Sequence, residues 1–408
     1  MDSDSRGGSS AAHSGGMLRI GMICPYSLTI PGGVQHQVLG LARSLRAKGH
    51  EVRVLGPCDG PPPESFVTPL GNSFLNATNG SVAPLAPDPS ASLRTIRALN
   101  DEAFDVLHIH EPLAPGPPMT SLLLKLAPIV GTFHSAGESV GYRTLQRQLT
   151  WLMKRCDVRT AVSKDALELA QRYFPGDYEV LYNGIELERY QSVEKVKKES
   201  AIFFIGRHEP RKGLEVLIQA VIQMPDDVVL WIASDGPETA DLKARYGHIS
   251  KIEWLGRISD SEKYLRLRRS AVFCAPSLHG ESFGVVLLEA MAAGTPVVAS
   301  ALPGYRNVAT HDVDALLVEP GNVQQLAAAL ARVIVDSRLS ARLVQAGNLQ
   351  ADRHSMMSLA TEFEVLYHRA LALEAADGSV HRTPRMLKMF ENRILRRSYS
   401  TMKGKYKS

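Results

Sequence analysis

The stretch HGESFGVVLLEAMAAGTPVVAS, residues 279–300, decides the fold of the second half of the chain. Residues 284–293 have the length of a helix of about three turns, which Gly294 and Pro296 would end, and the apolar run PVVAS follows as a strand. A second apolar run, AVFCAPS, stands just before the stretch. Strand, loop, helix and strand in this order predict a parallel βαβ unit.

The start of this predicted helix indicates a site for a phosphorylated ligand. The first backbone N–H groups of a helix have no intrahelical partner, and they bind phosphate without help from side chains. Here they belong to Ser282, Phe283, Gly284 and Val285. We expect Glu281, before the helix, to bind hydroxyls of a ligand, and Glu289, about two turns inward, to accept hydroxyls from a ribose. The alternatives are a capping role for Glu281 and a solvated position for Glu289, although the neighbours of Glu289 are all apolar.

Short β-rich runs alternate with helical patterns along both halves of the chain. The first series is LRIGMIC (18–24), HEVRVLG (50–56), DVLHIHE (105–111), PIVGTFH (128–134) and VRTAVS (158–163). The second is AIFFIGR (201–207), VVLWIAS (228–234), IEWLGR (252–257), AVFCAPS (271–277), PVVAS (296–300) and ALLVEP (315–320). Near-continuous apolar strands between helices predict an α/β protein with two doubly wound, Rossmann-like domains facing across a cleft.

The composition along the chain predicts the domain boundaries. We expect a disordered leader (1–16), an N-terminal Rossmann-like domain (17–186), a polar linker (187–200), a C-terminal Rossmann-like domain (201–355), a helix packing back on the first domain (356–376) and a basic, amphipathic tail (377–408). The segment 61–90 is rich in Pro, Gly and Ser, which predicts a long loop.

The overall composition is that of a soluble globular protein. The chain has 408 residues, of which 44% are hydrophobic and 22% charged. No apolar run approaches the roughly 18 residues of a membrane-spanning helix, and the leader lacks the apolar segment of a secretory signal. The four cysteines, Cys24, Cys58, Cys156 and Cys274, form no CxxC pair, so we expect buried thiols in the cytoplasm.

Basic residues concentrate at the C-terminus. Residues 381–408 contain nine Lys or Arg and one acid, a net charge of +8, which leaves −4 for the rest of a chain whose total is +4. Within 384–399, four apolar residues share one helical face, which favours binding of the tail to an anionic membrane surface. The alternative is a solvated tail with non-specific contacts to nucleic acid; we expect no specific nucleic acid partner.

Several motifs resemble those of the family 4 retaining glycosyltransferases, which have the GT-B fold. Besides the two glutamates in 279–300, they are PYSLTIPGGVQHQV (25–38), GRHEPRKG (206–213) and SDGPE (234–238). The likeness extends over roughly residues 17–370 and is greatest to the actinobacterial phosphatidylinositol mannosyltransferases. It implies that the first domain binds the acceptor, that the second binds the nucleotide sugar, and that a C-terminal helix returns to the first domain.

The resemblance implies roles for individual residues. Arg207 and Lys212 would neutralise the diphosphate of the donor as its bond to the sugar breaks, in place of a metal ion. His134 would face the transferred sugar, although a lone histidine at the end of a strand is usually structural. Together with Glu281 these are the expected catalytic residues. The full set expected to bind the nucleotide sugar is Gly32, Gly33, Arg207, Lys212, Ile258, Asp260, Lys263, Glu281, Ser282, Phe283, Gly284, Val285 and Glu289.

Two parts of the site remain open at this stage. Asp260, in the segment GRISDSEK (256–263) that resembles a guanine-reading loop, is also a candidate N-cap of the helix that follows. Tyr26, Gln35, Asn79 and Ser81 match positions that bind inositol phosphate in the mannosyltransferases. A basic residue expected nearby is here Pro84, and the next helix offers only Arg94 and Arg97.

The function implied is transfer of α-mannose from GDP-mannose to an inositol hydroxyl of phosphatidylinositol or a related glycolipid. We expect no cofactor and no metal, and a protein that is peripheral at the inner face of the plasma membrane. One alternative is the same chemistry with another donor or acceptor, such as UDP-N-acetylglucosamine with inositol phosphate, or mannose with another glycolipid. A binding protein without turnover and a dehydrogenase are the remaining alternatives, and the absence of a GxGxxG motif argues against the dehydrogenase.

Overall fold

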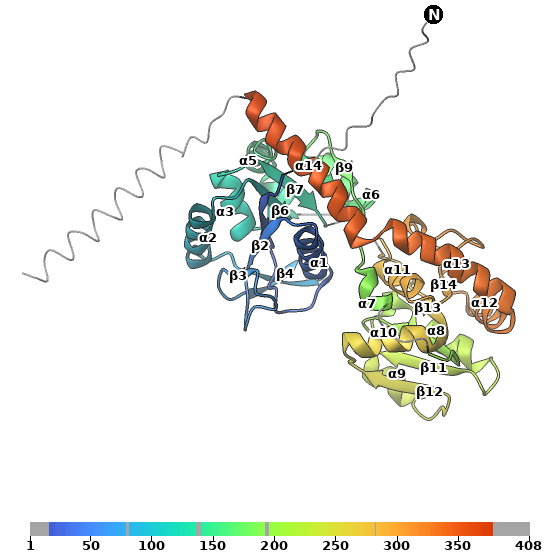
Figure 1. Ribbon diagram of the computed structural model, residues 1–408. Helices are drawn as coiled ribbons and strands as arrows, with labels where there is room; N and C mark the ends of the chain where they lie inside the picture. Colours follow the sequence, from blue (N-terminus) through green and yellow to red (C-terminus); the bar gives the residue numbers. More distant parts are fainter. Residues whose placement is uncertain (1–15, 79–80, 136–139, 192–195, 282, 378–408) are drawn as a thin grey trace, which may run out of the picture.

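The N-terminal domain is a doubly wound parallel α/β domain. The computed structural model describes residues 16–78, 81–135, 140–191, 196–281 and 283–377 (Figure 1). The strands are β1 (Arg19–Ile23), β2 (Glu51–Gly56), β3 (Val67–Pro69), β6 (Val106–His110), β7 (Ile129–Phe133), β8 (Val158–Ala161) and β9 (Glu179–Val180). They form one parallel sheet in the order β3-β2-β1-β6-β7-β8-β9. Its helices are α1 (Gly33–Ala47), α2 (Pro89–Glu102), α3 (Pro117–Leu124), α4 (Val140–Thr144), α5 (Gln146–Met153) and α6 (Lys164–Tyr173).

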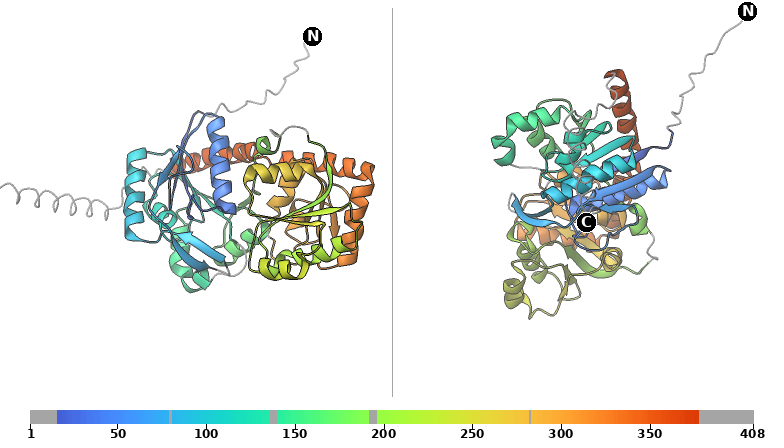
Figure 2. Two further views of the ribbon diagram at one scale, coloured as in Figure 1. Left: turned by 90° about the horizontal axis from the view of Figure 1, so that it is seen from below. Right: turned by 90° about the vertical axis from the view of Figure 1, so that its left-hand side faces the viewer.

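The C-terminal domain repeats this architecture. Its strands are β10 (Glu199–Ile205), β11 (Val229–Ala233), β12 (Ile252–Gly256), β13 (Ser270–Ala275), β14 (Val297–Ser300) and β15 (Leu316–Val318), all parallel in the order β12-β11-β10-β13-β14-β15. Its helices are α8 (Leu214–Ile222), α9 (Thr239–Tyr246), α10 (Asp260–Arg269), α11 (Val285–Ala292), α12 (Val323–Val335) and α13 (Ser337–Arg353). The two domains lie side by side (Figure 2). The predicted strands and the two-domain α/β fold are confirmed.

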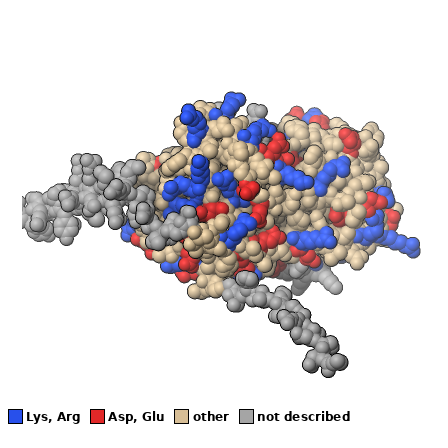
Figure 3. Space-filling view, turned by 90° about the horizontal axis from the view of Figure 1, so that it is seen from above, with Lys and Arg blue, Asp and Glu red and all other residues tan. Residues whose placement is uncertain are grey.

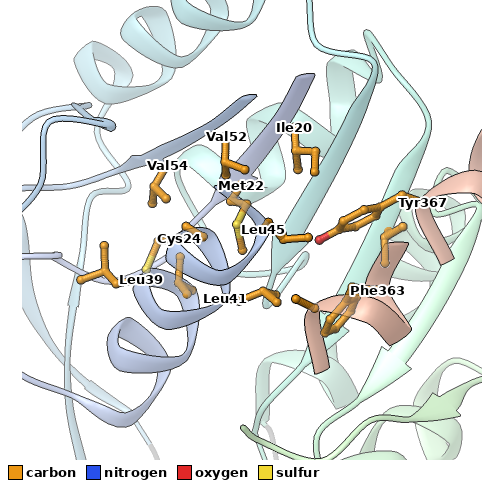
Figure 4. Packing of buried hydrophobic residues seen from close by; sticks show 14 of the residues in the cluster. Ile20, Met22, Cys24, Leu39, Leu41, Leu45, Val52, Val54, Phe363 and Tyr367 are labelled. Carbon is orange, nitrogen blue, oxygen red and sulfur yellow. The ribbon is translucent and has the colours of Figure 1, made fainter. Parts of the chain in front are cut away.

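The last helix, α14 (Met356–Asp377), crosses from the C-terminal domain to the first domain (Figure 1). Its apolar face, including Phe363 and Tyr367, packs in the same core cluster as Ile20 and Met22 of β1 (Figure 4). The phenol of Tyr367 is fully buried. The return of a C-terminal helix to the first domain is therefore confirmed.

Two expectations about connecting segments need correction. Segment 61–90 is not one long loop, because it contributes strand β3 to the sheet and an antiparallel hairpin, β4 (Phe74–Thr78) and β5 (Ser81–Leu85). Its Pro and Gly content therefore accompanies short strands rather than a structureless segment, with Pro69 at the end of β3 and Pro84 within β5. Segment 187–200 contains helix α7 (Leu187–Gln191) and the start of β10, so it is not simply a polar linker.

Two further findings concern the class of protein. The four cysteines are free and buried, as expected. None of the helices in the part of the chain that the structure describes is long and apolar enough to cross a membrane. The leader and the basic tail lie outside the described residues.

Candidate active site

The turn that follows β10 brings two cations to Glu281. Nζ of Lys212 lies 2.6 Å from Oε1 of Glu281, and Nη1 of Arg211 lies 3.4 Å from the same oxygen. The hydroxyl of Ser277 donates to this oxygen at 2.9 Å. The carboxylate is only 12% exposed, so these donors compensate the charge that the fold buries.

Arg207 lies at the outer end of the same charge network. Its guanidinium is 67% exposed and pairs with Oε1 of Glu209 at 2.9 Å, while Oε2 of Glu209 pairs with Arg211 at 2.9 Å. Alternating charges thus connect Arg207 with Lys212 through Glu209, Arg211 and Glu281. The structure places both predicted clamp cations in one network, but Lys212 and Arg211, rather than Arg207, contact Glu281.

A glycine turn fixes the backbone that carries these cations. Residues 210–212 form a short 3-10 helix, and Gly213 follows with a φ of 66°. A Cβ at Gly213 would lie 2.1 Å from the carbonyl oxygen of Pro276, so no other residue fits this close approach. The backbone N–H of Leu278 donates to the carbonyl of Arg211 at 2.7 Å, which joins this turn to the loop after β13.

Helix α11 begins beside Glu281, as the sequence predicts. Its N-cap, Gly284, has a φ of 95° and offers no side chain to cap the first N–H groups. The side chain of Phe283 is buried in the domain core and stacks on Tyr182, so only its backbone is available to a ligand. Ser282 lies outside the described residues.

Glu289 faces a charged partner rather than solvent. Its Oε1 lies 3.0 Å from Nζ of Lys263, and the two side chains are 18% and 15% exposed. Burial by itself would lower the pKa of Lys263, but the charge and hydrogen bond of Glu289 raise it overall. Burial and the charge of Glu289 likewise raise the pKa of the Tyr190 phenol. The alternative of a solvated Glu289 is wrong.

Residues of both domains line one cavity of about 280 Å³ next to this pair. From the N-terminal domain it includes Gly33 and His36; from the C-terminal domain it includes Asp260, Lys263, Tyr264, Val285 and Glu289. A Cβ at Gly33 would meet nothing within 4 Å, whereas one at Gly32 would meet the amide of Gln35 at 2.4 Å. The structure thus brings together five of the residues expected to bind the nucleotide sugar: Gly33, Asp260, Lys263, Val285 and Glu289.

The alternative role of Asp260 is also decided. Ser259, not Asp260, is the N-cap of α10, and its hydroxyl accepts from the backbone N–H of Glu262. Asp260 is the first helical residue, with its carboxylate 3.7 Å from Nζ of Lys263. Ile258, just before the helix, packs against the core of the C-terminal domain.

His134 directly follows β7, is partly exposed and lies beside the buried His110. Its Nε2 is 2.9 Å from Nδ1 of His110, and burial lowers the pKa of His134 to about 3. Glu111 accepts the backbone N–H groups of His134 and Ser135 at 2.7 and 2.5 Å. Glu111 has a φ of 49°, a strained value for a residue with a Cβ, and such strain is typical of functional sites.

The acceptor residues are only partly described. Burial is the largest cause that raises the pKa of the Tyr26 phenol. The nearby side chains of Glu111 and Cys24 raise this pKa further. The amide of Gln35 donates to the carbonyls of Ser27 and Ile30 at 3.2 and 3.1 Å, so it supports the loop before α1. Asn79 and the side chain of Ser81 lie outside the described residues.

Three residues of the site were missed by sequence reasoning: Arg211, Tyr190 and Glu111. Arg211 stands next to Lys212 in the same motif. Two adjacent cations before a glycine could have indicated that both contribute to the site. Glu111 directly follows a buried strand, which is a common place for functional polar residues. Tyr190 had no comparable signal, because its contact with Glu289 joins segments that are distant in sequence.

Comparisons with known proteins show the family to which the chain belongs. Residues 31–189 match the family model "Glycosyltransferase Family 4", and residues 187–350 match "Glycosyl transferases group 1". A phosphatidyl-myo-inositol mannosyltransferase of Mycobacterium leprae (strain TN) is 39% identical over 361 residues, 86% of this chain and 96% of that protein. One of Propionibacterium freudenreichii subsp. shermanii is 32% identical over 393 residues, 91% and 98% of the two chains.

Solved structures share the fold at lower identity. A sucrose-phosphate synthase from Thermosynechococcus elongatus has a TM-score of 0.66 at 19% identity and covers 87% of this chain and 99% of its own. Anabaena HepE in complex with UDP-glucose has a TM-score of 0.64 at 20% identity, with coverages of 86% and 99%. The chain therefore belongs to the family 4 glycosyltransferases of the GT-B fold, where its relatives include the phosphatidyl-myo-inositol mannosyltransferases of actinobacteria.

Proposed function

We propose that this enzyme transfers α-mannose from GDP-mannose to an inositol hydroxyl of phosphatidylinositol or a related glycolipid. The observation that carries the proposal is the convergence of Arg211 and Lys212 on Glu281, shortly before α11, whose residues Val285 and Glu289 line a cavity between the domains. Cations and helix amides stabilise the negative charge that develops on a departing diphosphate. The names of the relatives support mannose as the sugar and phosphatidylinositol as the acceptor.

In the proposed reaction, the bond between the sugar carbon C1 and the diphosphate oxygen breaks. A bond from C1 to the acceptor oxygen forms on the same face, and the acceptor proton passes to the departing diphosphate. Glu281 orients the sugar, Arg207 and Lys212 hold the diphosphate, and Glu289 binds the ribose. No metal or cofactor is needed, because the clamp cations supply the compensating charge. Proton NMR of the product would show an α anomer; a β product would contradict retention.

The donor is tested by a screen of GDP-, UDP- and ADP-sugars against one lipid extract. We expect turnover with GDP-mannose, since the carboxylate of Asp260 suits the paired N–H donors of guanine. Mass spectrometry of the lipids after incubation with phosphatidylinositol then identifies the product. A preference for a UDP-sugar would overturn the mannosyl assignment while leaving a glycosyltransferase.

A different glycolipid acceptor is the second candidate, and Pro84 favours it. The resemblance to the mannosyltransferases predicts a basic residue at this position. Pro84 is instead buried in β5, and its carbonyl accepts a hydrogen bond from the backbone N–H of Ser27 at 3.0 Å. A buried proline offers no charge to an inositol phosphate. Side-by-side incubation with phosphatidylinositol and with a total glycolipid fraction separates the two acceptors.

A lipid acceptor requires access to a membrane, and the described surface favours this. Arg143, Arg147 and Lys154 of the α4–α5 segment are exposed and take part in no ion pair between described residues, and Trp151 nearby is 57% exposed. Figure 3 shows several Lys and Arg side chains on the half of the molecule that the N-terminal domain forms, with Asp and Glu side chains among them. Exposed cations beside an exposed tryptophan suit the surface of an anionic bilayer.

Sedimentation with anionic vesicles tests this binding and the role of the basic tail. The full chain, a truncation at Gly378 and the double variant Arg143→Gln/Arg147→Gln are compared, with neutral vesicles as the control. We propose the cytoplasmic face of the plasma membrane as the location, so the full chain should bind anionic vesicles only. If the truncated form binds as well as the full chain, the tail has no part in anchoring.

A further inference from the structure

Three imidazoles form a continuous row in the N-terminal domain, here called the histidine row: His108, His110 and His134. His108 and His110 lie two positions apart on β6 and therefore on the same face of the sheet. Their rings stack with centroids 4.2 Å apart and an interplanar angle of 28°. Nδ1 of His110 lies 2.9 Å from Nε2 of His134, so the row ends at the predicted catalytic histidine.

The far end of the row is fixed by partners on both sides. Nδ1 of His108 is 2.8 Å from the hydroxyl of Tyr367 in α14, and its Nε2 is 2.7 Å from Oγ1 of Thr132. His108 therefore cannot rotate without losing two buried hydrogen bonds, and its ring supports that of His110 by stacking. The backbone of His134 is held separately by the carboxylate of Glu111.

The hydrogen bond between His110 and His134 admits two proton arrangements. Burial lowers the pKa of both rings, so both are neutral at pH 7, and each neutral ring has one N–H donor and one acceptor nitrogen. Nε2 of His110 is buried and has no hydrogen-bond partner among the residues that the structure describes. If Nε2 of His134 donated to Nδ1 of His110, the proton of His110 would lie on its Nε2, where it has no acceptor. If Nδ1 of His110 donates instead, Nε2 of His110 carries only a lone pair. Orphaned N–H groups are the rarer defect in protein interiors, which favours donation by His110.

We propose that His110 donates from Nδ1 to Nε2 of His134 and thereby fixes the proton of His134 on Nδ1, as a hydrogen-bond donor to the transferred sugar. His110 is a positioning residue, since it acts through His134. In this arrangement His134 has no free lone pair, so it is not the base that takes the acceptor proton, and the departing diphosphate remains to take it. The inference rests on the proposed function and on the expectation, from the family resemblance, that His134 faces the transferred sugar.

The tautomer can be measured without any turnover. Nitrogen NMR of the full chain labelled with ¹⁵N-histidine, with the His134 signals assigned by loss in His134→Gln, distinguishes a proton on Nδ1 from one on Nε2. We expect the Nδ1–H tautomer. An Nε2–H tautomer of His134 would overturn the inference, whereas absence of hexose transfer to any lipid would overturn only the proposed function.

Two substitutions test the positioning role kinetically. Asparagine places an amide N–H close to the position of Nδ1, whereas leucine fills the space without a donor. For His110→Leu we expect kcat to fall at least 30-fold with GDP affinity within two-fold of the parent, and for His110→Asn we expect kcat within about five-fold. Equal losses in both variants, or a loss confined to KM, would contradict the role. Tyr367→Phe, which releases His108 at the far end of the row, should lower kcat less than His110→Leu does.

Discussion

Nζ of Lys212 lies 2.6 Å from Oε1 of Glu281, although the two residues are 69 positions apart. One comes from the turn after β10 and the other from the loop after β13, and these strands are neighbours in the sheet. The ion pair therefore joins the two motifs at the carboxyl edge of the C-terminal sheet, where ligands of doubly wound domains bind.

Removing the Lys212 charge should weaken binding of the diphosphate. For Lys212→Met we expect kcat/KM to fall about 100-fold or more, close to 2.7 kcal/mol of transition-state stabilisation. Calorimetric titration should show a larger loss of affinity for GDP than for GMP, because the contact is to the second phosphate. Arg338→Met, an exposed position at the start of α13, is the control and should leave both unchanged. Equal losses for GDP and GMP would remove Lys212 from the diphosphate site.

Glu289 should be responsible for recognition of the ribose hydroxyls. The parent enzyme is expected to prefer GDP over 2′-deoxy-GDP, and Glu289→Gln should lose most of that preference, because a neutral amide accepts hydroxyl protons more weakly. Affinity for GDP should fall about ten-fold. Binding constants for both nucleotides in both proteins measure the effect. A preference that survives in the variant would place the ribose elsewhere.

Gly213 should not tolerate a side chain. Gly213→Ala forces a Cβ to 2.1 Å from the carbonyl oxygen of Pro276 at a φ of 66°, so the Arg211–Lys212 turn must shift. We expect a loss of about 1–3 kcal/mol in the free energy of unfolding and a lower turnover. Gly206→Ala is the matched control, since its Cβ would make an ordinary contact of 3.4 Å with Phe204. Urea unfolding of both variants decides the comparison, and a fully stable, active Gly213→Ala would contradict it.

The buried histidines should make stability depend on pH. Burial lowers the pKa of His108 to about 3, from an ordinary value of about 6.5. Above pH 6.5 both states are neutral and the effect is absent; below it, only the unfolded chain takes up the proton, so stability falls as the pH falls towards 3. At pH 5 one such histidine costs about 2 kcal/mol.

Urea unfolding at pH 7.5 and pH 5 measures this dependence. His108→Gln removes one titrating group while retaining polar atoms, so it should be less stable than the parent at pH 7.5. Its further loss between the two pH values should be smaller by about 2 kcal/mol. An identical loss in parent and variant would show that His108 is not buried in the neutral form.

The sequence by itself determined the alternation of strands and helices, the two doubly wound domains and the place of Glu289 within an apolar helix. These features follow from local patterns, because the apolar period and the Gly and Pro positions of a segment report how that segment is buried. The hairpin within 61–90 was missed because composition does not reveal which short strands will find partners. Only the tertiary structure decided that Arg211 joins Lys212 at Glu281, that Lys263 pairs with Glu289, and that His108 and His110 connect α14 to His134. Each of these contacts joins side chains from different segments of the chain. The distances between these side chains, and the positions of the protons on the histidines, depend on how the sheets bring those segments together.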